Sequence, residues 1–208
     1  MLDINVQRDF LGADAVLPVA NRQGALEGLR VVMHQVRLCR IPVVSCIDVS
    51  GPNHGSHAGP ASHVDHSIAR RKVSFSLMPR RLFVQADNSL GLPRNVLTRY
   101  RQVMFAKRGP DVLGNPKLER LFDELCCERV YVCGVALEQS VREVVLGLLV
   151  RQVRATLIAD ACGYFDLRQA KLALRQIEAK GAGISSAETF CREASALSRR
   201  PRPLLRAK

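Results

Sequence analysis

Short β-branched, apolar runs alternate along this chain with longer segments in which apolar residues recur at helical spacing. Runs of the first kind suit strands covered on both faces, and segments of the second kind suit helices with one buried side. Their regular alternation is typical of parallel strands joined by crossover helices. The sequence therefore predicts an α/β fold, a three-layer α/β/α sandwich with a mostly parallel central sheet. The expected strands are residues 2–6, 41–48, 102–105, 129–135, 155–159 and 183–186, and the expected helices are residues 21–36, 116–125, 140–151 and 167–180.

The length of 208 residues fits one domain with a single core. We expect this domain to span residues 1–190. The last stretch, residues 191–208, has six Arg and Lys residues against Glu193 alone, and it contains prolines. A basic, disordered C-terminal tail is therefore expected there.

Several classes of protein are excluded by composition. No apolar run reaches the roughly 18 to 20 residues that a membrane span needs, and the N-terminus lacks the pattern of a secretion signal. We therefore expect a cytoplasmic protein with no membrane partner. The seven cysteines form no CxxC pair, which favours buried free thiols over a disulfide framework or a zinc ribbon.

Three distant segments carry recognisable motifs. Residues 4–10 read INVQRDF, residues 103–108 read VMFAKR and residues 132–141 read VCGVALEQSV. In this order they resemble the V-D-x-Q-x-D-F motif, the strand ending in the catalytic lysine, and the V-x-G-x-x-T-x-x-C-V turn of the isochorismatase-like superfamily of cysteine hydrolases, which includes nicotinamidases. Residues 159–163 and 172–182 are similar to that superfamily's closing strand, helix and strand. The resemblance spans roughly residues 2–190 and implies the same α/β fold.

This resemblance implies a triad of an aspartate base, a lysine and a cysteine nucleophile, of which two members are replaced here. The matching positions are Asn5, Lys107 and Ser140. An asparagine amide cannot accept a proton near neutral pH, and a serine hydroxyl is far less acidic than a thiol and needs an adjacent base. The superfamily's turn also implies oxyanion donors and a cis peptide between the first two of its residues. The turn residues are Val135, Ala136 and Gln139.

The substitutions leave two hypotheses open. The first is a catalytically impaired family member, a pseudoenzyme that binds a small amide-like or carboxylate ligand or serves through assembly, because triad residues act as a unit. The second is a hydrolase of small amides or vinyl ethers that uses Ser140 as nucleophile. Glu138 or Asp3 could then supply the missing carboxylate, although Asp3 lies about 6 to 7 Å along the strand from Asn5. Superfamily members usually form dimers or larger assemblies, so the resemblance also implies a homo-oligomer.

A histidine-rich loop follows the second expected strand. Asp48, His54, His57 and His63 resemble the set with which nicotinamidase-like proteins bind a divalent metal, and such ligands suit zinc, iron or manganese. The position two after Asp48 is Ser50 rather than the histidine of those relatives. The alternative is a solvated polar loop that binds no metal, and the triad chemistry itself requires no cofactor.

The net charge of +12 bears on partners rather than on fold. Basic residues gather between residues 70 and 108, and such clusters can bind nucleic-acid phosphates. Aromatic residues make up only 5% of the chain and tryptophan is absent, so platforms for stacking bases are scarce. We therefore favour a solvated basic face, or arginines that bridge the subunits of an oligomer, over a nucleic-acid-binding protein. Lys107 and Arg108, beside the expected pocket, suit an anionic small ligand.

Overall fold

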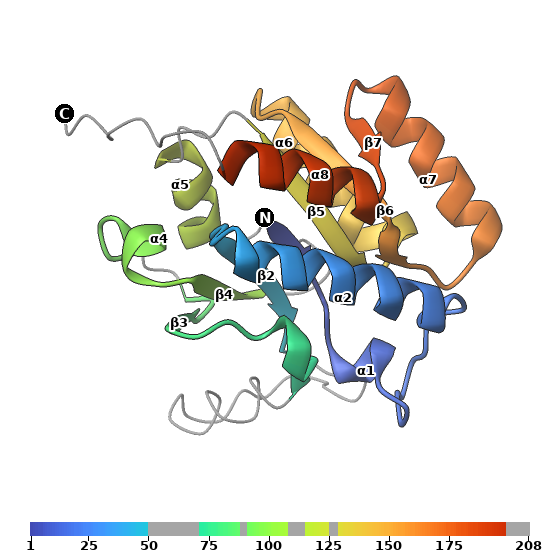
Figure 1. Ribbon diagram of the computed structural model, residues 1–208, viewed down its shortest axis with the longest axis horizontal. Coiled ribbons are helices and arrows are strands. Elements are labelled where there is room, and N and C mark those ends of the chain that lie inside the picture. Colours follow the sequence, from blue (N-terminus) through green and yellow to red (C-terminus); the bar gives the residue numbers. More distant parts are fainter. Residues whose placement is uncertain (50–70, 88–90, 108–114, 125–128, 199–208) are drawn as a thin grey trace.

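The computed structural model describes residues 1–49, 71–87, 91–107, 115–124 and 129–198 (Figure 1). Within them, seven strands form one sheet in the order β3-β4-β2-β1-β5-β6-β7, and all neighbouring strands are parallel. This confirms the predicted α/β class, with a sheet that is parallel throughout. The strands are β1 Leu2–Ile4, β2 Val43–Asp48, β3 Arg81–Val84, β4 Gln102–Lys107, β5 Val130–Val135, β6 Ala155–Gly163 and β7 Gly183–Ser185.

Helices cover both faces of this sheet. The connections from β1 to β2 and from β5 to β6 run in opposite directions along the strand order, so right-handed crossovers place their helices on opposite faces. In Figure 1, α2 and α8 lie side by side across one face, whereas α6 contacts α7 and β6. The helices are α1 Arg8–Leu11, α2 Arg22–Leu38, α4 Val96–Arg99, α5 Pro116–Glu124, α6 Arg142–Val150, α7 Leu167–Ala179 and α8 Ala187–Ser198.

The helix predicted at residues 21–36 is α2, and the apolar face expected from its spacing is buried. Removing each large apolar side chain of that face from water stabilises the fold by roughly 1.5 to 3 kcal/mol. Asn21 precedes the helix, but its side chain makes no capping bond. Instead its amide donates to the carbonyl of Cys162 at 2.9 Å and accepts from the N–H of Tyr164 at 3.0 Å. Asn21 therefore joins the start of α2 to the end of β6.

Strand β1 lies at the centre of the sheet, between β2 and β5. Ile4 is opposite Gly134 of β5 in the register, and a β-carbon at residue 134 would lie 2.0 Å from the Ile4 carbonyl oxygen. Gly134 also has φ +124°, a conformation that side chains rarely adopt. Glycine is therefore required where β5 passes the central strand.

A buried ion pair fixes the segment that follows the undescribed residues 50–70. Lys72 Nζ lies 2.5 Å from Asp3 Oδ1 in β1, and neither side chain is exposed. The other Asp3 oxygen accepts from the Ser45 hydroxyl at 2.7 Å, and Gln102 Nε2 donates to that hydroxyl oxygen at 2.9 Å. This network links β1, β2 and β4 to the residues around Lys72.

Several elements differ from the sequence prediction, among them the short helices α1 and α4, which were not expected. The short strand β3 was not expected; it is an edge strand whose first residue, Arg81, is exposed. The tail predicted from residue 191 is wrong as far as Ser198, because α8 continues to that residue and packs Phe190 and Ala194 into the core. Residues 199–208 lie outside the described part of the chain.

The described cysteines bear out the expectation of free thiols. No disulfide joins them, and Cys46, Cys133 and Cys162 are fully buried. Residues 126 and 127, the other two cysteines, lie outside the described residues. None of the helices in the described part of the chain combines the length and apolar character that a membrane span needs.

Candidate active site

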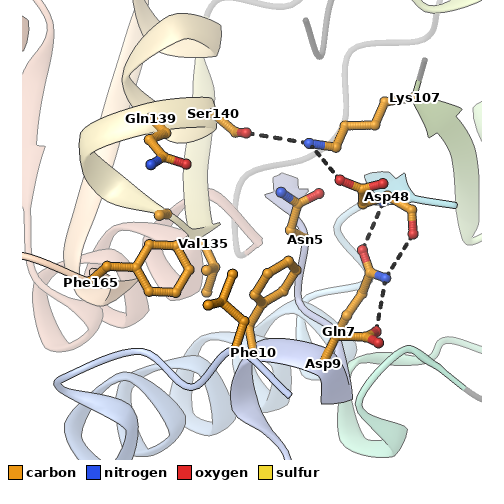
Figure 2. Close-up of a pocket in the computed structure, with 12 residues that line it drawn as sticks. Asn5, Gln7, Asp9, Phe10, Asp48, Lys107, Val135, Gln139, Ser140 and Phe165 are labelled. Atoms are coloured by element: carbon orange, nitrogen blue, oxygen red, sulfur yellow. Dashed lines mark hydrogen bonds and ion pairs between the residues drawn. The ribbon is translucent and has the colours of Figure 1, made fainter. Parts of the chain in front are cut away.

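Four neighbouring strands end at a shared cavity. The carboxyl ends of the parallel strands β4, β2, β1 and β5 lie together, at the point where connections leave toward opposite faces of the sheet, and such points form the ligand sites of open α/β sheets. The cavity has a volume of about 220 Å³ (Figure 2). Asn5 follows β1, Lys107 ends β4 and Ser140 follows β5, and all three line the cavity. The structure thus brings together the three triad positions singled out in the sequence.

Lys107 stands between two oxygen atoms, as Figure 2 shows. Its Nζ lies 3.2 Å from Asp48 Oδ2 and 3.4 Å from Ser140 Oγ. The lysine is 4% exposed, whereas the Asp48 side chain is 28% exposed and partly open to solvent. The end of β4 is held in turn by Asn115, whose amide donates to the carbonyl of Ala106 at 2.9 Å. The ammonium is therefore positioned to donate to Ser140 while an acidic side chain compensates its charge.

The backbone at Asn5 turns out of β1 with φ 47°, a left-handed conformation that asparagine adopts more readily than most residues. Its N–H donates to the carbonyl of Cys46 at 2.9 Å. Its Oδ1 is buried and accepts no hydrogen bond from any described residue. Asp3 does not line the cavity, because its carboxylate is bound to Lys72 and Ser45. Asp3 is thus held away from the reacting positions.

The turn after β5 carries Ser140 on a kinked helical segment, Leu137–Val141, in which Gln139 has non-helical backbone angles. The peptide bond between Val135 and Ala136 is cis, as the resemblance implied. The carbonyl of Ala136 accepts from the N–H groups of Gln139 and Val141, both at 3.1 Å. The Gln139 N–H is therefore engaged within the turn and is not free for an oxyanion, whereas the residue itself lines the cavity.

Glu138, the suggested auxiliary acid, has a different role in the structure. Its Oε1 accepts from the N–H groups of Phe165 at 2.7 Å and Asp166 at 3.0 Å. The residue is 8% exposed and does not line the cavity. It therefore holds the segment before α7 rather than Ser140.

Gln7 holds the backbone of Asp48 at the site. In the sequence, only its position within the first motif pointed to a role for this residue. Its Oε1 accepts from the Asp48 N–H at 2.8 Å, and its Nε2 donates to the Asp48 carbonyl at 3.0 Å. Nε2 also lies 3.4 Å from Asp9 Oδ2. With Gln7 almost fully buried, these bonds fix the backbone from which the Asp48 carboxylate reaches Lys107.

Part of the cavity wall is apolar. Phe10 and Phe165 meet edge to face with ring centroids 6.2 Å apart, and Val135 and Leu17 also line the cavity. Figure 2 shows both rings on the side of the cavity away from Lys107. The sequence did not indicate this wall, because Phe10 and Phe165 are far apart along the chain.

Only Asp48 of the predicted metal ligands is described, since His54, His57 and His63 lie outside the described residues. Its carboxylate is paired with Lys107, and no group of three or more His, Cys, Asp or Glu side chains that could hold a metal occurs among the described residues. One carboxylate does not form a metal site.

The buried thiols near the sheet centre do not replace a nucleophile. Burial raises the pKa of Cys46 and that of Cys133 above the usual range for a thiol, and neither residue lines the cavity. Because the thiolate is the nucleophilic form, both groups are unreactive. Ser140 is the hydroxyl that lines the described cavity beside Lys107.

Comparisons with known proteins agree with this architecture. The family model of the isochorismatase domain matches residues 1–189. An isochorismatase-like hydrolase from Alkaliphilus metalliredigens has a TM-score of 0.67 at 13% identity, with 92% of this chain and 96% of that chain covered. A pyrazinamidase from Pyrococcus horikoshii, solved in complex with zinc, has a TM-score of 0.61 at 20% identity, with coverage of 89% and 97%.

The YcaC gene product of Escherichia coli, an octameric hydrolase of unknown specificity, has a TM-score of 0.62 at 12% identity, with 92% of this chain and 76% of that chain covered. At such identities, the likeness to the solved structures concerns the fold alone. A search of curated proteins found no match.

Proposed function

Because this chain belongs to the isochorismatase domain family, we propose that it is a pseudoenzyme of that family, which binds a small molecule in its cavity without hydrolysing it. One observation carries the proposal. An amide, Asn5, and a hydroxyl, Ser140, line the cavity beside Lys107, where the family resemblance implies an acid and a thiol. The pocket and the lysine are thus retained while the two reacting groups are replaced.

The hydrogen-bonding groups of the site support binding rather than chemistry. Lys107 and Ser140 can donate to an acceptor on a ligand, and the Asn5 amide can pair with a donor. The nearest partner of the Ser140 hydroxyl among the described residues is the Lys107 ammonium at 3.4 Å. An ammonium has no lone pair with which to take the hydroxyl proton, so this contact orients Ser140 without activating it.

The alternative is a hydrolase that uses Ser140 as nucleophile. The contacts from Ser140 to Lys107 and from Lys107 to Asp48 favour it, because they form a continuous polar chain of 3.4 Å and 3.2 Å steps, and serine–lysine pairs can support acyl transfer. We place this alternative second, because the Asp48 carboxylate pairs with the Lys107 ammonium and not with the Ser140 hydroxyl among the contacts of the described residues.

Turnover assays separate the two functions. Small amides such as nicotinamide and pyrazinamide would be incubated with the parent protein, with Ser140→Ala and with the double reversion Asn5→Asp/Ser140→Cys. We expect no turnover by the first two and measurable turnover by the reversion. Turnover by the parent that disappears in Ser140→Ala would instead establish the hydrolase. Ser195→Cys, which adds a thiol at the contact between α2 and α8, is the matched control for non-specific thiol reactivity.

Homo-oligomer formation is a separate part of the proposal. The octameric state described for YcaC of Escherichia coli shows that this fold is compatible with assembly. Light scattering coupled to size-exclusion chromatography would measure the mass in solution. A mass of one chain, about 23 kDa, at micromolar concentration would argue against assembly.

A further inference from the structure

Three charged side chains line the cavity in the described part of the chain, namely Asp9, Asp48 and Lys107. The ammonium of Lys107 already has a counter-ion, because Asp48 Oδ2 lies 3.2 Å away. The polar wall therefore presents two carboxylates and one compensated cation. Such a wall repels a second anion placed beside Lys107.

The remaining polar groups of the cavity are complementary to a ligand that both donates and accepts hydrogen bonds. Asn5 Oδ1 is buried without a partner among the described residues, and a buried acceptor left unpaired is costly. Lys107 Nζ and the Ser140 hydroxyl, 3.4 Å apart, offer donors beside it. An uncharged carboxamide supplies an N–H for the first group and a carbonyl for the others, whereas a carboxylate has no donor.

The position of Asp48 is set by the backbone and not only by its attraction to Lys107. Two hydrogen bonds of the buried Gln7 amide go to the Asp48 N–H and carbonyl, at 2.8 and 3.0 Å. Because these bonds hold the backbone of Asp48, an anionic ligand could displace the carboxylate only by rotating the Asp48 side chain away from Lys107. Otherwise the ligand would have to share the ammonium with Asp48 at close range.

We propose that Asp48 determines the specificity of this cavity: by neutralising Lys107 it makes the site select an uncharged carboxamide over the matching carboxylate. This inference rests on the proposed ligand-binding function, and it departs from the anionic ligand that the sequence suggested. Without the Asp48 charge, a ligand carboxylate would take its place beside Lys107, and the preference would shift toward anions.

Benzamide and benzoate are suitable probes, because they share one ring and differ only in the head group. Their dissociation constants would be measured by NMR titration of backbone amides in chelator-treated protein, for the parent and for Asp48→Asn. We expect the parent to bind benzamide about tenfold more tightly or better, and Asp48→Asn to bind benzoate about tenfold more tightly than the parent does. Glu27→Gln removes the same charge from the exposed face of α2 and should leave the ratio unchanged. Asp9→Asn, the second carboxylate at the cavity, should shift the ratio in the same direction by a smaller factor.

The outcomes separate the role of Asp48 in specificity from the proposed ligand-binding function. Binding of benzoate by the parent as tight as that of benzamide would overturn the role of Asp48 and leave ligand binding intact. The same would follow if the ratio were unchanged in Asp48→Asn, or if Glu27→Gln shifted it equally. Absence of any binding to the parent and the variants would overturn the proposed function and the inference together.

Discussion

The ion pair between Asp3 and Lys72 has neither side chain exposed to water, and we predict that Lys72→Met destabilises the fold by about 3 to 5 kcal/mol. The substitution leaves the Asp3 carboxylate buried with the Ser45 hydroxyl, 2.7 Å away, as its remaining described donor. Asp3→Asn should cost a similar amount, because it strands the Lys72 ammonium. The double variant removes both charges and should cost only about 1 to 3 kcal/mol, chiefly for lost hydrogen bonds.

Urea unfolding followed by circular dichroism measures this cycle. The double variant should be at least about 3 kcal/mol more stable than the sum of the single effects implies. If Lys72→Met alone does not fold, recovery of folded protein in the double variant tests the same point. Asp14→Asn, in an exposed pair with Arg8, should leave the urea midpoint unchanged. Single effects below about 1 kcal/mol, or singles that simply add, would refute the reasoning.

Four other predictions concern different parts of the molecule. Gly134→Ala should give no folded protein by circular dichroism, because the alanine β-carbon would lie 2.0 Å from the Ile4 carbonyl oxygen. The control Gly24→Ala has open space around its β-carbon in α2 and should stabilise the protein by about 0.5 to 1 kcal/mol. Burial raises the pKa of Cys162 to about 12, so the thiol proton is lost at lower pH in the unfolded chain than in the folded protein. The free energy of unfolding should therefore fall as the pH rises from about 9 to 12. This fall should be smaller in Cys162→Ala. Elemental analysis should find no stoichiometric zinc, iron or manganese, because the described metal candidate Asp48 is paired with Lys107; about one metal per chain would favour the predicted histidine site. The protein should pass through heparin at physiological salt, and retention that falls steeply with salt would favour the nucleic-acid hypothesis.

Features encoded by short-range periodicity or by a contiguous motif could be predicted from the sequence. The buried face of α2 follows from the spacing of its apolar residues, and the motifs led to Asn5, Lys107 and Ser140. The edge strand β3 could not be found in this way, because four residues that begin with an exposed Arg81 carry no clear alternation. In α8 a signal was available, since Ala187, Phe190 and Ala194 recur at helical spacing, but the basic composition beyond residue 191 obscured it.

Side-chain contacts between distant segments could not be predicted from the sequence. Nothing local indicates that Asp48 would bind Lys107 or that Lys72 would bind Asp3, because each partner is far along the chain and the contact depends on strand order. Glu138 illustrates the same limit. Two residues from Ser140 it suggested a base, yet its direction in the turn sends it to the N–H groups of Phe165 and Asp166.

The central place of β1 has a consequence for how the molecule assembles. Leu2 pairs with both Val44 and Val132, which are 88 residues apart in the sequence. The two halves of the sheet therefore join only when these two distant stretches have both paired with the same three-residue strand. Such long-range closure is slow compared with helix formation. The cavity beside β1 therefore exists only after both halves of the sheet have paired with this strand. A small molecule that fills the cavity would bind only the folded protein and would stabilise it by mass action.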